Sequence, residues 1–364
     1  MTLLYFAPVP WDSYLQRPHY VAKYFLQRRG GRVVWIDPYP TRLPAMADLR
    51  AVWRRPRLKT PRPGGLTVVR PGALPIEPLA TGRWLNRHVL WHRLHRRLPA
   101  FSGGKQLVLG IGRPHTLALA ALERLDPAWS FYDAMDDFPE FFRGRAQRAA
   151  AESERAIVST VSTVLTASSG LWDKFASLGD KRRLVMNGFD MASLPPLAAR
   201  PSGPPVLGYI GTVASWFDWP LVVRLARAVP NAAIHIVGPR YVATPRSLPA
   251  NVKLFPACDH ERAIEHLAGF SVGLIPFKRN RLTDSVDPIK YYAYRAMGLS
   301  VLTTRFGEMA HRGPGDGAYL LDEDLGLEAS AYAALGASRA HDEQVEHFRA
   351  ENSWERRFAE AGLF

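Results

Sequence analysis

Three carboxylates lie close together in the first half of the sequence. Asp133, Asp136 and Asp137 stand at the end of an apolar run, Trp129–Ala134, that is typical of a buried strand. Neighbouring carboxylates raise one another's pKa, because each negative charge disfavours the next. A carboxylate with a raised pKa can accept a proton from a hydroxyl group near neutral pH. The segment therefore predicts a general base, although Asp137 could instead cap a helix that begins at Pro139.

A lysine stands near the start of a helix predicted in the second half. We expect Asp287 to cap this helix, Pro288 to occupy its first position and Gly298 to end it. Lys290 then lies in the first turn, where the positive end of the helix dipole disfavours a cation. A bound anion would remove that cost, since free amides and an ammonium together suit a diphosphate. The alternative is a lysine that merely points into solvent.

Two predicted strands of the second half end in glycine. One runs into Gly211 and Thr212, the other into Gly238 and Pro239. A glycine lets a ligand approach the backbone, and a hydroxyl beside unpaired amides suits a phosphate oxygen. Each motif is equally compatible with a plain turn, so neither alone defines a site.

Polar side chains also follow two strands of the first half. They are Trp11, Asp12, Arg17 and His19 after the first strand, and Arg113 and His115 after a later one. We expect them to contact an acceptor or a donor phosphate, and His19 is a second candidate base. Structurally, Asp12 would instead cap a helix through residues 17–28. The later segment lacks the third glycine of a dinucleotide-binding fingerprint, which excludes nicotinamide binding.

Short apolar runs alternate with helical segments along the chain, which indicates parallel sheets covered on both faces. The predicted strands are Leu3–Val9, Arg32–Asp37, Leu66–Arg70, Gln106–Gly110, Trp129–Ala134, Thr163–Ala167 and Arg183–Met186, then Val206–Ile210, Ala233–Val237, Val252–Phe255, Val272–Pro276, Ser300–Thr303 and Tyr319–Leu321. A stretch rich in proline and small residues, 194–205, separates the two series. The pattern predicts two doubly wound α/β domains, whose ligands bind at the carboxyl ends of the strands.

The composition narrows the class of protein. Of 364 residues, 47% are apolar, which excludes a disordered chain, and the single cysteine excludes a disulfide scaffold. We see no His/Cys set with metal-ligand spacing, and predict no metal and no cofactor. No apolar run reaches the ~20 residues of a membrane-spanning helix, and no secretory signal is visible. We therefore expect a cytoplasmic protein or one attached to the cytosolic membrane face.

The net charge of +14 is concentrated in arginine-rich segments. Between Trp84 and Leu98, a helix would place Trp84, Trp91 and Leu94 on one arc, with Arg87 intruding. Tryptophan and arginine together are typical of a helix that lies on an anionic membrane surface. The alternatives are a core-packing helix with a basic face and nucleic-acid binding, but no nucleic-acid-binding motif is present.

The second half resembles the nucleotide-sugar domain of GT-B glycosyltransferases. The resemblance rests on the strands that end in Gly-Thr and Val-Gly-Pro, the helix Asp-Pro-Ile-Lys-Tyr-Tyr, the strand Val-Leu-Thr-Thr, Asn187–Asp190 and the segment around Trp354. It implies two Rossmann-like domains facing a cleft: an acceptor domain at 1–198, a nucleotide-sugar domain at 199–340 and a helix at 341–364 that crosses back. It also implies that Ser285, Asp287, Tyr291 and Glu308 contact the donor.

One departure separates this chain from many retaining, family-4-like members, which carry glutamate where this chain has Ala293. The glutamate is also missing in the similar xanthan-type glucuronosyltransferase family of inverting, membrane-attached enzymes. Matching its Tyr-x-x-x-Asp segment to Tyr132 places the base at Asp136. The resemblance thus implies metal-independent, inverting transfer from a UDP-sugar to a lipid-linked or saccharide acceptor in polysaccharide or glycolipid biosynthesis. A sugar-nucleotide epimerase of the same fold and a non-catalytic protein that binds lipid or nucleic acid are the alternatives.

Overall fold

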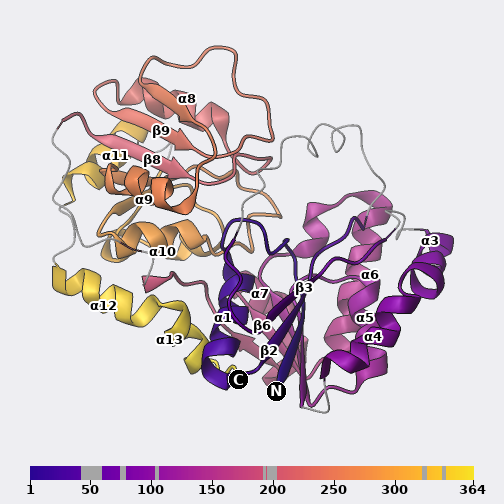
Figure 1. Cartoon of the computed structure of the whole chain (residues 1–364). Helices are drawn as coiled ribbons and strands as arrows, with labels where there is room; N and C mark the ends of the chain where they lie inside the picture. The colour runs from indigo at the N-terminus through magenta and orange to yellow at the C-terminus, as the bar shows by residue number, and fades with distance from the viewer. Residues whose placement is uncertain are drawn as a thin grey trace. The chain divides into compact units, whose positions relative to one another are not determined.

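The computed structural model describes residues 1–41, 60–73, 79–102, 106–191, 194, 203–321, 326–337 and 342–364. These residues form two compact units, each built around one parallel sheet (Figure 1). The first unit contains Met1–Val185 and the chain end Phe358–Phe364, and the second contains Met186–Arg357. The α/β class with two doubly wound sheets is therefore confirmed.

The first sheet has seven strands in the order β3-β2-β1-β4-β5-β6-β7. Its elements are β1 (Thr2–Phe6), α1 (Arg17–Arg29), β2 (Arg32–Ile36), β3 (Leu66–Val69), α3 (Ala80–Leu85), η1 (Asn86–Leu90), α4 (His92–Ser102), β4 (Leu107–Ile111), α5 (Thr116–Leu125), β5 (Trp129–Ala134), η2 (Phe138–Phe141), α6 (Gly144–Thr160), β6 (Thr163–Thr166), α7 (Ser169–Lys174), η3 (Ala176–Lys181) and β7 (Arg182–Leu184). Every residue of β1, β4 and β6 is buried, because helices cover both faces. All seven predicted strands are present.

The second sheet has six strands in the order β10-β9-β8-β11-β12-β13. Its elements are β8 (Val206–Ile210), α8 (Trp219–Ala228), β9 (Ala233–Val237), β10 (Val252–Phe255), α9 (His260–Ala268), β11 (Val272–Ile275), α10 (Ile289–Ala296), β12 (Ser300–Thr303), η5 (Gly307–His311), η6 (Pro314–Asp316), β13 (Ala318–Leu320), α11 (Leu327–Gly336), α12 (Asp342–Asn352) and α13 (Trp354–Glu360). The six predicted strands are all found. In both sheets the strand order reverses beside the first strand of the unit, and such reversal points are where ligands of these folds bind.

The chain end packs into the first unit through aromatic rings. Helix α13 spans the boundary between the units, and its residues from Phe358 onward belong to the first. The Phe358 ring lies 5.5 Å from that of Tyr24, and the Phe364 ring lies 4.9 Å from that of Phe25. Both partners are on α1, so the end of the chain helps to hold this helix in place.

The segment between Trp84 and Leu98 is not one helix, which corrects the sequence prediction. It consists of α3, a π-helical turn η1, and α4 (Figure 1). The amide of Trp91 donates to the carbonyl of Asn86, five residues back, which rotates the later residues relative to an α-helix. Trp91 and Leu98 are buried, whereas Trp84 and Leu90 are exposed. The predicted apolar arc is thus divided between the core and the surface.

Candidate functional site

In the second unit, the carboxyl ends of β8 and β9 meet the first turn of α10. A β-carbon built on Gly211 would lie 2.6 Å from Cε and 2.9 Å from Nζ of Lys290. A β-carbon on Gly238 would collide with the carbonyl oxygen of Gly211. Both glycines also have positive φ angles, +137° and +135°. The structure therefore brings Gly211, Gly238 and Lys290 together, and a side chain at either glycine would separate them.

Helix α10 is held in this position by Tyr294. Its ring packs directly on Gly273 of β11, and its hydroxyl accepts a hydrogen bond from the amide of Ile210 at 3.1 Å. Tyr294 lies four residues after Lys290, so the two side chains share one face of the helix. The contact at the end of β8 consequently fixes where the lysine lies.

The Lys290 ammonium has no anionic partner among the residues that the structure describes. It lies instead over the faces of two aromatic rings, 5.3 Å from the centre of Tyr209 and 5.5 Å from that of Phe277. Burial lowers the pKa of Lys290 to about 8. No side chain caps the helix start beside it, where Pro288 is the N-cap residue. Uncapped amides and an unpaired cation form a site for an anion.

One of the two backbone amides that the sequence suggested for a ligand, that of Gly211, is already hydrogen-bonded. The Gly211 amide donates to the carbonyl of Val237 at 2.9 Å, so it is occupied by the sheet. Thr212, whose carbonyl accepts a hydrogen bond from the Tyr209 hydroxyl at 2.6 Å, keeps its own amide without a hydrogen bond in the described part of the chain. Thr212 and the start of α10 are therefore the backbone donors left for a ligand.

Asp287 does not cap α10, contrary to the sequence prediction. Its buried carboxylate accepts hydrogen bonds from the amide of Asn187 at 2.9 Å and the hydroxyl of Tyr292 at 2.8 Å. It also pairs with the guanidinium of Arg312 at 2.9 Å. Asp287 therefore acts as a structural carboxylate, and its contact with the donor stays a prediction. Arg312, which sequence reasoning missed, lies far from Asp287 in the sequence.

The other predicted donor contacts lie close to α10. Tyr291 is buried, donates to the carbonyl of Asp316 at 3.0 Å and carries Arg312 over its ring at 3.8 Å. It is engaged within the protein, which argues against a donor contact. Ser285 and Glu308 are buried in the loop before α10 and in η5, respectively. The Glu308 amide donates to the carbonyl of Val286 at 3.1 Å, which ties η5 to that loop. Pro239, half-buried, follows Gly238 at the end of β9.

In the first unit, the three aspartates at the end of β5 have different surroundings. Asp133 is completely buried. Its carboxylate pairs with Nε of Arg17 at 2.8 Å and accepts a hydrogen bond from the Tyr5 hydroxyl at 3.2 Å. This aspartate is unavailable to a substrate, and Arg17, also completely buried, is not the surface contact that the sequence suggested.

Asp137 belongs to a second ion-paired group. The Lys174 ammonium lies 2.8 Å from Asp137 and 2.6 Å from Glu154. Glu154 in turn accepts a hydrogen bond from the Tyr132 hydroxyl at 2.8 Å. The Asp137 side chain makes no capping hydrogen bond to η2, although it occupies the N-cap position. Lys174 and Glu154 could not be predicted as members of this group from the sequence, because they come from α7 and α6.

Asp136 is the aspartate whose carboxylate has no hydrogen-bond or ion-pair partner in the described residues, and it is half-buried. Burial raises its pKa to about 7; the charge of Arg17 lowers it, and Asp133 and Asp137 raise it further. A carboxylate that titrates near pH 7 and is not occupied by protein groups has the properties of a general base.

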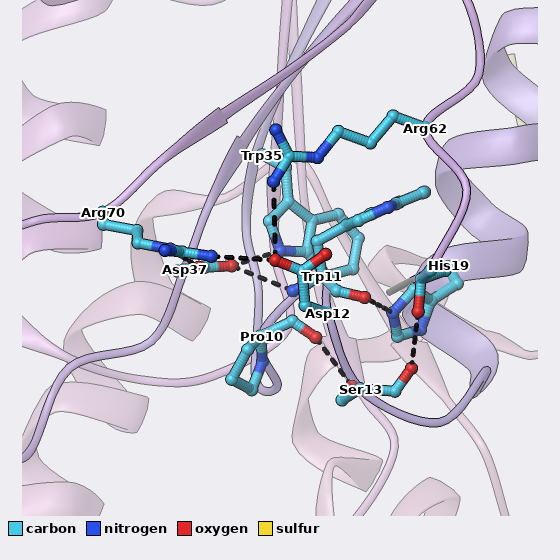
Figure 2. Close-up of polar contacts among 10 residues, drawn as sticks. Pro10, Trp11, Asp12, Ser13, His19, Trp35, Asp37, Arg62 and Arg70 are labelled. Atoms are coloured by element: carbon cyan, nitrogen blue, oxygen red, sulfur yellow. Dashed lines mark hydrogen bonds and ion pairs between the residues drawn. The ribbon is translucent and has the colours of Figure 1, made fainter. Parts of the chain in front are cut away.

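His19 and Trp11 form part of a buried aromatic cluster, shown in Figure 2. The His19 ring lies 5.1 Å from Trp11 and 5.0 Å from Trp35. Its Nδ1 accepts from the amide of Gln16 at 3.2 Å, and its Nε2 lies 3.2 Å from the carbonyl of Trp11, which makes Nε2 the donor. Burial lowers the His19 pKa to about 4. The histidine is neutral and enclosed, so it is not a base, and Trp11 is a core residue.

Asp12 lies beside this cluster and takes part in ion pairs at the protein surface (Figure 2). Arg70 bridges two carboxylates, with Nη2 at 2.8 Å from Asp12 and Nε at 3.1 Å from Asp37. Arg62 lies 3.4 Å from Asp12. Asp37 also accepts from the amide of Trp11 and the indole of Trp35, at 2.9 and 3.0 Å. Asp12 therefore does not cap α1; it neutralises two exposed arginines.

The predicted contacts after β4 also have structural roles. His115 is buried, and its Nδ1 caps α5 by accepting from the amide of Ala118 at 3.1 Å. Burial lowers its pKa to about 3, with a smaller effect from Arg113. Arg113 is half-buried and donates to the Thr41 hydroxyl at 2.7 Å. His115 is thus a helix cap rather than a ligand contact.

Of the residues predicted to face a membrane, some are exposed and others are buried. Trp91 is 1% exposed, and its indole donates to the carbonyl of Gly72, so it is not a surface residue. Trp84 is 59% exposed. Other large apolar side chains near it in the sequence are also exposed; we define Leu79, Trp84, Leu85, Val89 and Leu90 as the Trp84 patch. Arg87 is exposed and pairs with Glu123 at 2.9 Å, and Leu94 is half-buried.

A groove of about 490 Å³ adjoins the Trp84 patch. Its lining includes Trp84, three arginines (Arg83, Arg87 and Arg124) and His88. Its walls therefore combine apolar and cationic groups. No helix among the described residues has the length and apolar character needed to cross a bilayer. The same residues contain no cluster of three potential metal ligands.

Comparisons with known proteins identify the fold. No family model matches the chain, and no curated protein matches it in sequence. Among solved structures it is similar to sucrose-phosphate synthase from Thermosynechococcus elongatus, with a TM-score of 0.68 and 14% identity, over 100% of this chain and 97% of that one. It is also similar to WaaG, a glycosyltransferase involved in lipopolysaccharide biosynthesis, with a TM-score of 0.65 and 13% identity, over 100% and 99%.

A third similar structure is Anabaena Alr3699/HepE in complex with UDP and glucose, with a TM-score of 0.60 and 14% identity, over 99% of this chain and 95% of that one. All three similarities cover nearly the whole chain at low sequence identity. The chain therefore has the two-domain α/β fold of GT-B glycosyltransferases.

Proposed function

We propose that this protein is a glycosyltransferase that takes a sugar from a nucleoside diphosphate, most simply a UDP-sugar. The observation that carries the proposal is the Lys290 ammonium, which has no counter-ion in the described chain and lies against Gly211 beside an uncapped helix start. A diphosphate supplies the negative charge that the ammonium lacks, and its oxygens accept hydrogen bonds from the unpaired amides. The GT-B fold and the UDP bound in one similar structure support the same ligand.

In the proposed reaction, Asp136 is the base. It accepts the proton of an acceptor hydroxyl, whose oxygen forms a bond to the anomeric carbon while the bond from that carbon to the diphosphate breaks. The ammonium of Lys290 and the helix dipole stabilise the charge that develops on the departing diphosphate. Because this cation is supplied by the chain itself, we propose that transfer needs no divalent metal, and that direct displacement inverts the anomeric configuration.

The first experiment measures binding of UDP to the full chain by isothermal titration calorimetry. We expect micromolar binding that survives removal of divalent metals with a chelator. Lys290→Ala should weaken it by about 10- to 100-fold, whereas Lys253→Ala, which removes an exposed lysine of β10, should leave it unchanged. Normal UDP binding by Lys290→Ala would contradict the proposal. Incubation with UDP-sugars then separates the alternatives, since an epimerase converts the sugar nucleotide without any acceptor.

We further propose that the acceptor is lipid-linked and that the protein works at an anionic membrane surface on the cytoplasmic side. The Trp84 patch would enter the headgroup region, and the arginines of the adjoining groove would contact lipid phosphates. Replacing Trp84 and Leu90 with serine should reduce flotation with vesicles that contain phosphatidylglycerol. The exposed Tyr332 on α11 offers a matched control, Tyr332→Ser, that should float normally. Equal flotation with neutral vesicles would contradict the electrostatic part.

A further inference from the structure

The carboxylate of Asp136 lies in a cluster whose charges do not balance. Its cations are Arg17 and Lys174, and its carboxylates are Asp133, Asp136, Asp137 and Glu154. Each cation is already committed to a carboxylate at 2.8 Å or less. When every group is ionised the cluster carries an excess of negative charge, so one carboxylate holds a proton most readily. In the described part of the chain, Asp136 is the carboxylate of this cluster that has no hydrogen-bond or ion-pair partner.

Arg17 occupies an unusual place in this cluster. It is completely buried, and it binds Asp133 through Nε and the carbonyl of Val185 through Nη1 at 2.5 Å. Its guanidinium also lies 6.0 Å from the centre of the Phe358 ring. Burying a guanidinium is costly, and a buried pair is often no more stable than apolar residues of the same volume. Stability alone therefore does not account for this pair three residues from Asp136.

We propose that Arg17 is a positioning residue for the base: by holding Asp133 in a buried ion pair at the end of β5, it offsets a negative charge that would otherwise favour the protonated form of Asp136, so that Asp136 can ionise and accept a proton. The inference rests on the proposed role of Asp136. Tyr5 assists, because its hydroxyl donates to the second oxygen of Asp133. Burial and the negative charge of Asp133 raise the Tyr5 pKa, so this hydroxyl remains a donor at any physiological pH.

The charged side chains that act on Asp136 come from several elements of the first unit. Arg17 on α1 favours its ionised form, whereas Asp133 and Asp137 disfavour it. Lys174 on α7 offsets Asp137 and Glu154. Removing Arg17 leaves the negative charge of Asp133 uncompensated, and removing Asp133 leaves the positive charge of Arg17. The two changes should therefore shift the titration of Asp136 in opposite directions.

The test follows the carboxyl carbon of Asp136 by NMR in the full chain labelled with ¹³C at aspartate carboxyls, with Asp136→Asn identifying the signal. We expect Arg17→Met to raise the titration midpoint by about one pH unit and Asp133→Asn to lower it. Arg28→Met, an exposed arginine of the same helix, should leave it unchanged. Midpoints that stay constant, or that move in the same direction in both variants, would overturn the inference.

A second variant, Tyr5→Phe, and the rate of transfer complete the test. Arg17→Met leaves a buried charge unpaired and can fail to fold. In that case the near-isosteric Tyr5→Phe decides, because removing the hydroxyl from Asp133 should raise the midpoint, and an unchanged midpoint would overturn the inference. The NMR readout needs no substrate, so it is independent of transfer activity. Loss of transfer in Asp136→Asn with unmoved midpoints would refute the role of Arg17 alone, whereas normal transfer in Asp136→Asn would refute the proposed base.

Discussion

The two sheets end in sites of opposite charge. Among the residues that the structure describes, a carboxylate without an ion-pair partner, Asp136, lies at the carboxyl edge of the first sheet, and an ammonium without one, Lys290, lies at that of the second. Both lie after central strands of doubly wound sheets, and burial shifts the pKa of both toward neutrality. The comparison shows that the same topology serves as a base site or as an anion site, depending on which charge the neighbouring residues leave uncompensated.

Removing the Asp136 carboxylate should have the largest effect and tests whether the first site is a base site. Asp136→Asn should lower the rate of sugar transfer by about 10²- to 10⁴-fold, because a general base contributes on that order. Asp137→Asn should cost far less, since Lys174 already occupies that carboxylate. Initial rates with a UDP-sugar and an acceptor measure both variants. If Asp137→Asn lowers the transfer rate more than Asp136→Asn does, Asp137 is the base.

Removing the ammonium should have the next largest effect. Lys290→Met should weaken UDP binding by about 10- to 100-fold, the contribution of a hydrogen bond to a charged group. The change keeps the apolar contacts with Tyr209 and Phe277, so the fold should be preserved. Calorimetric titration measures the dissociation constant. Unchanged affinity for UDP would show that Lys290 does not form an anion site.

The units should also differ in their response to acid. His19 and His115, both in the first unit, are buried with pKa values lowered to about 4 and about 3. As the pH falls below about 6.5, both histidines bind protons in the unfolded chain but stay neutral in the folded unit, so they destabilise the first unit between pH 6.5 and 4. The raised pKa of Asp136 acts in the opposite direction and offsets part of this loss. Hydrogen exchange by mass spectrometry should show the first unit opening earlier on acidification. Earlier opening of the second unit would contradict this expectation.

The smallest predicted effect is the pH dependence of ligand binding. The pKa of Lys290 is about 8 in the unoccupied site, and a bound diphosphate favours the charged form. UDP affinity should therefore fall as the pH rises above about 8, by less than the roughly 10- to 100-fold that Lys290→Met costs, because the bound diphosphate keeps part of the lysine protonated. Affinity measured between pH 6 and 10 tests this, with Lys290→Met expected to lose the dependence. A dependence that survives in that variant would exclude Lys290 as its source.

Much of the fold could be predicted from the sequence. Short runs that are mostly apolar predict the thirteen strands of the described residues, because strands covered on both faces are largely apolar. The helix that carries Lys290 was also predictable from its proline and glycine, and the spacing of Lys290 and Tyr294 already places both on one face. Local signals failed at Asp287, which makes hydrogen bonds to residues far away in the chain instead of capping the helix. They also failed between Trp84 and Leu98, where a π-helical turn replaces the expected α-helix.

The sequence by itself determined the two-sheet architecture and the chemistry available at the strand ends, since apolar periodicity and residue type are properties of local segments. It offered Asp136, Asp133 and His19 as candidate bases and Arg17 as a contact for an acceptor or a donor phosphate. Only the tertiary structure separated them, because burial and the partners of a charge depend on residues far apart in the chain. Arg17 and Asp133 neutralise each other across 116 positions, His19 is enclosed by two indoles, and Asp136 alone of these four keeps its charged group without a protein partner in the described residues.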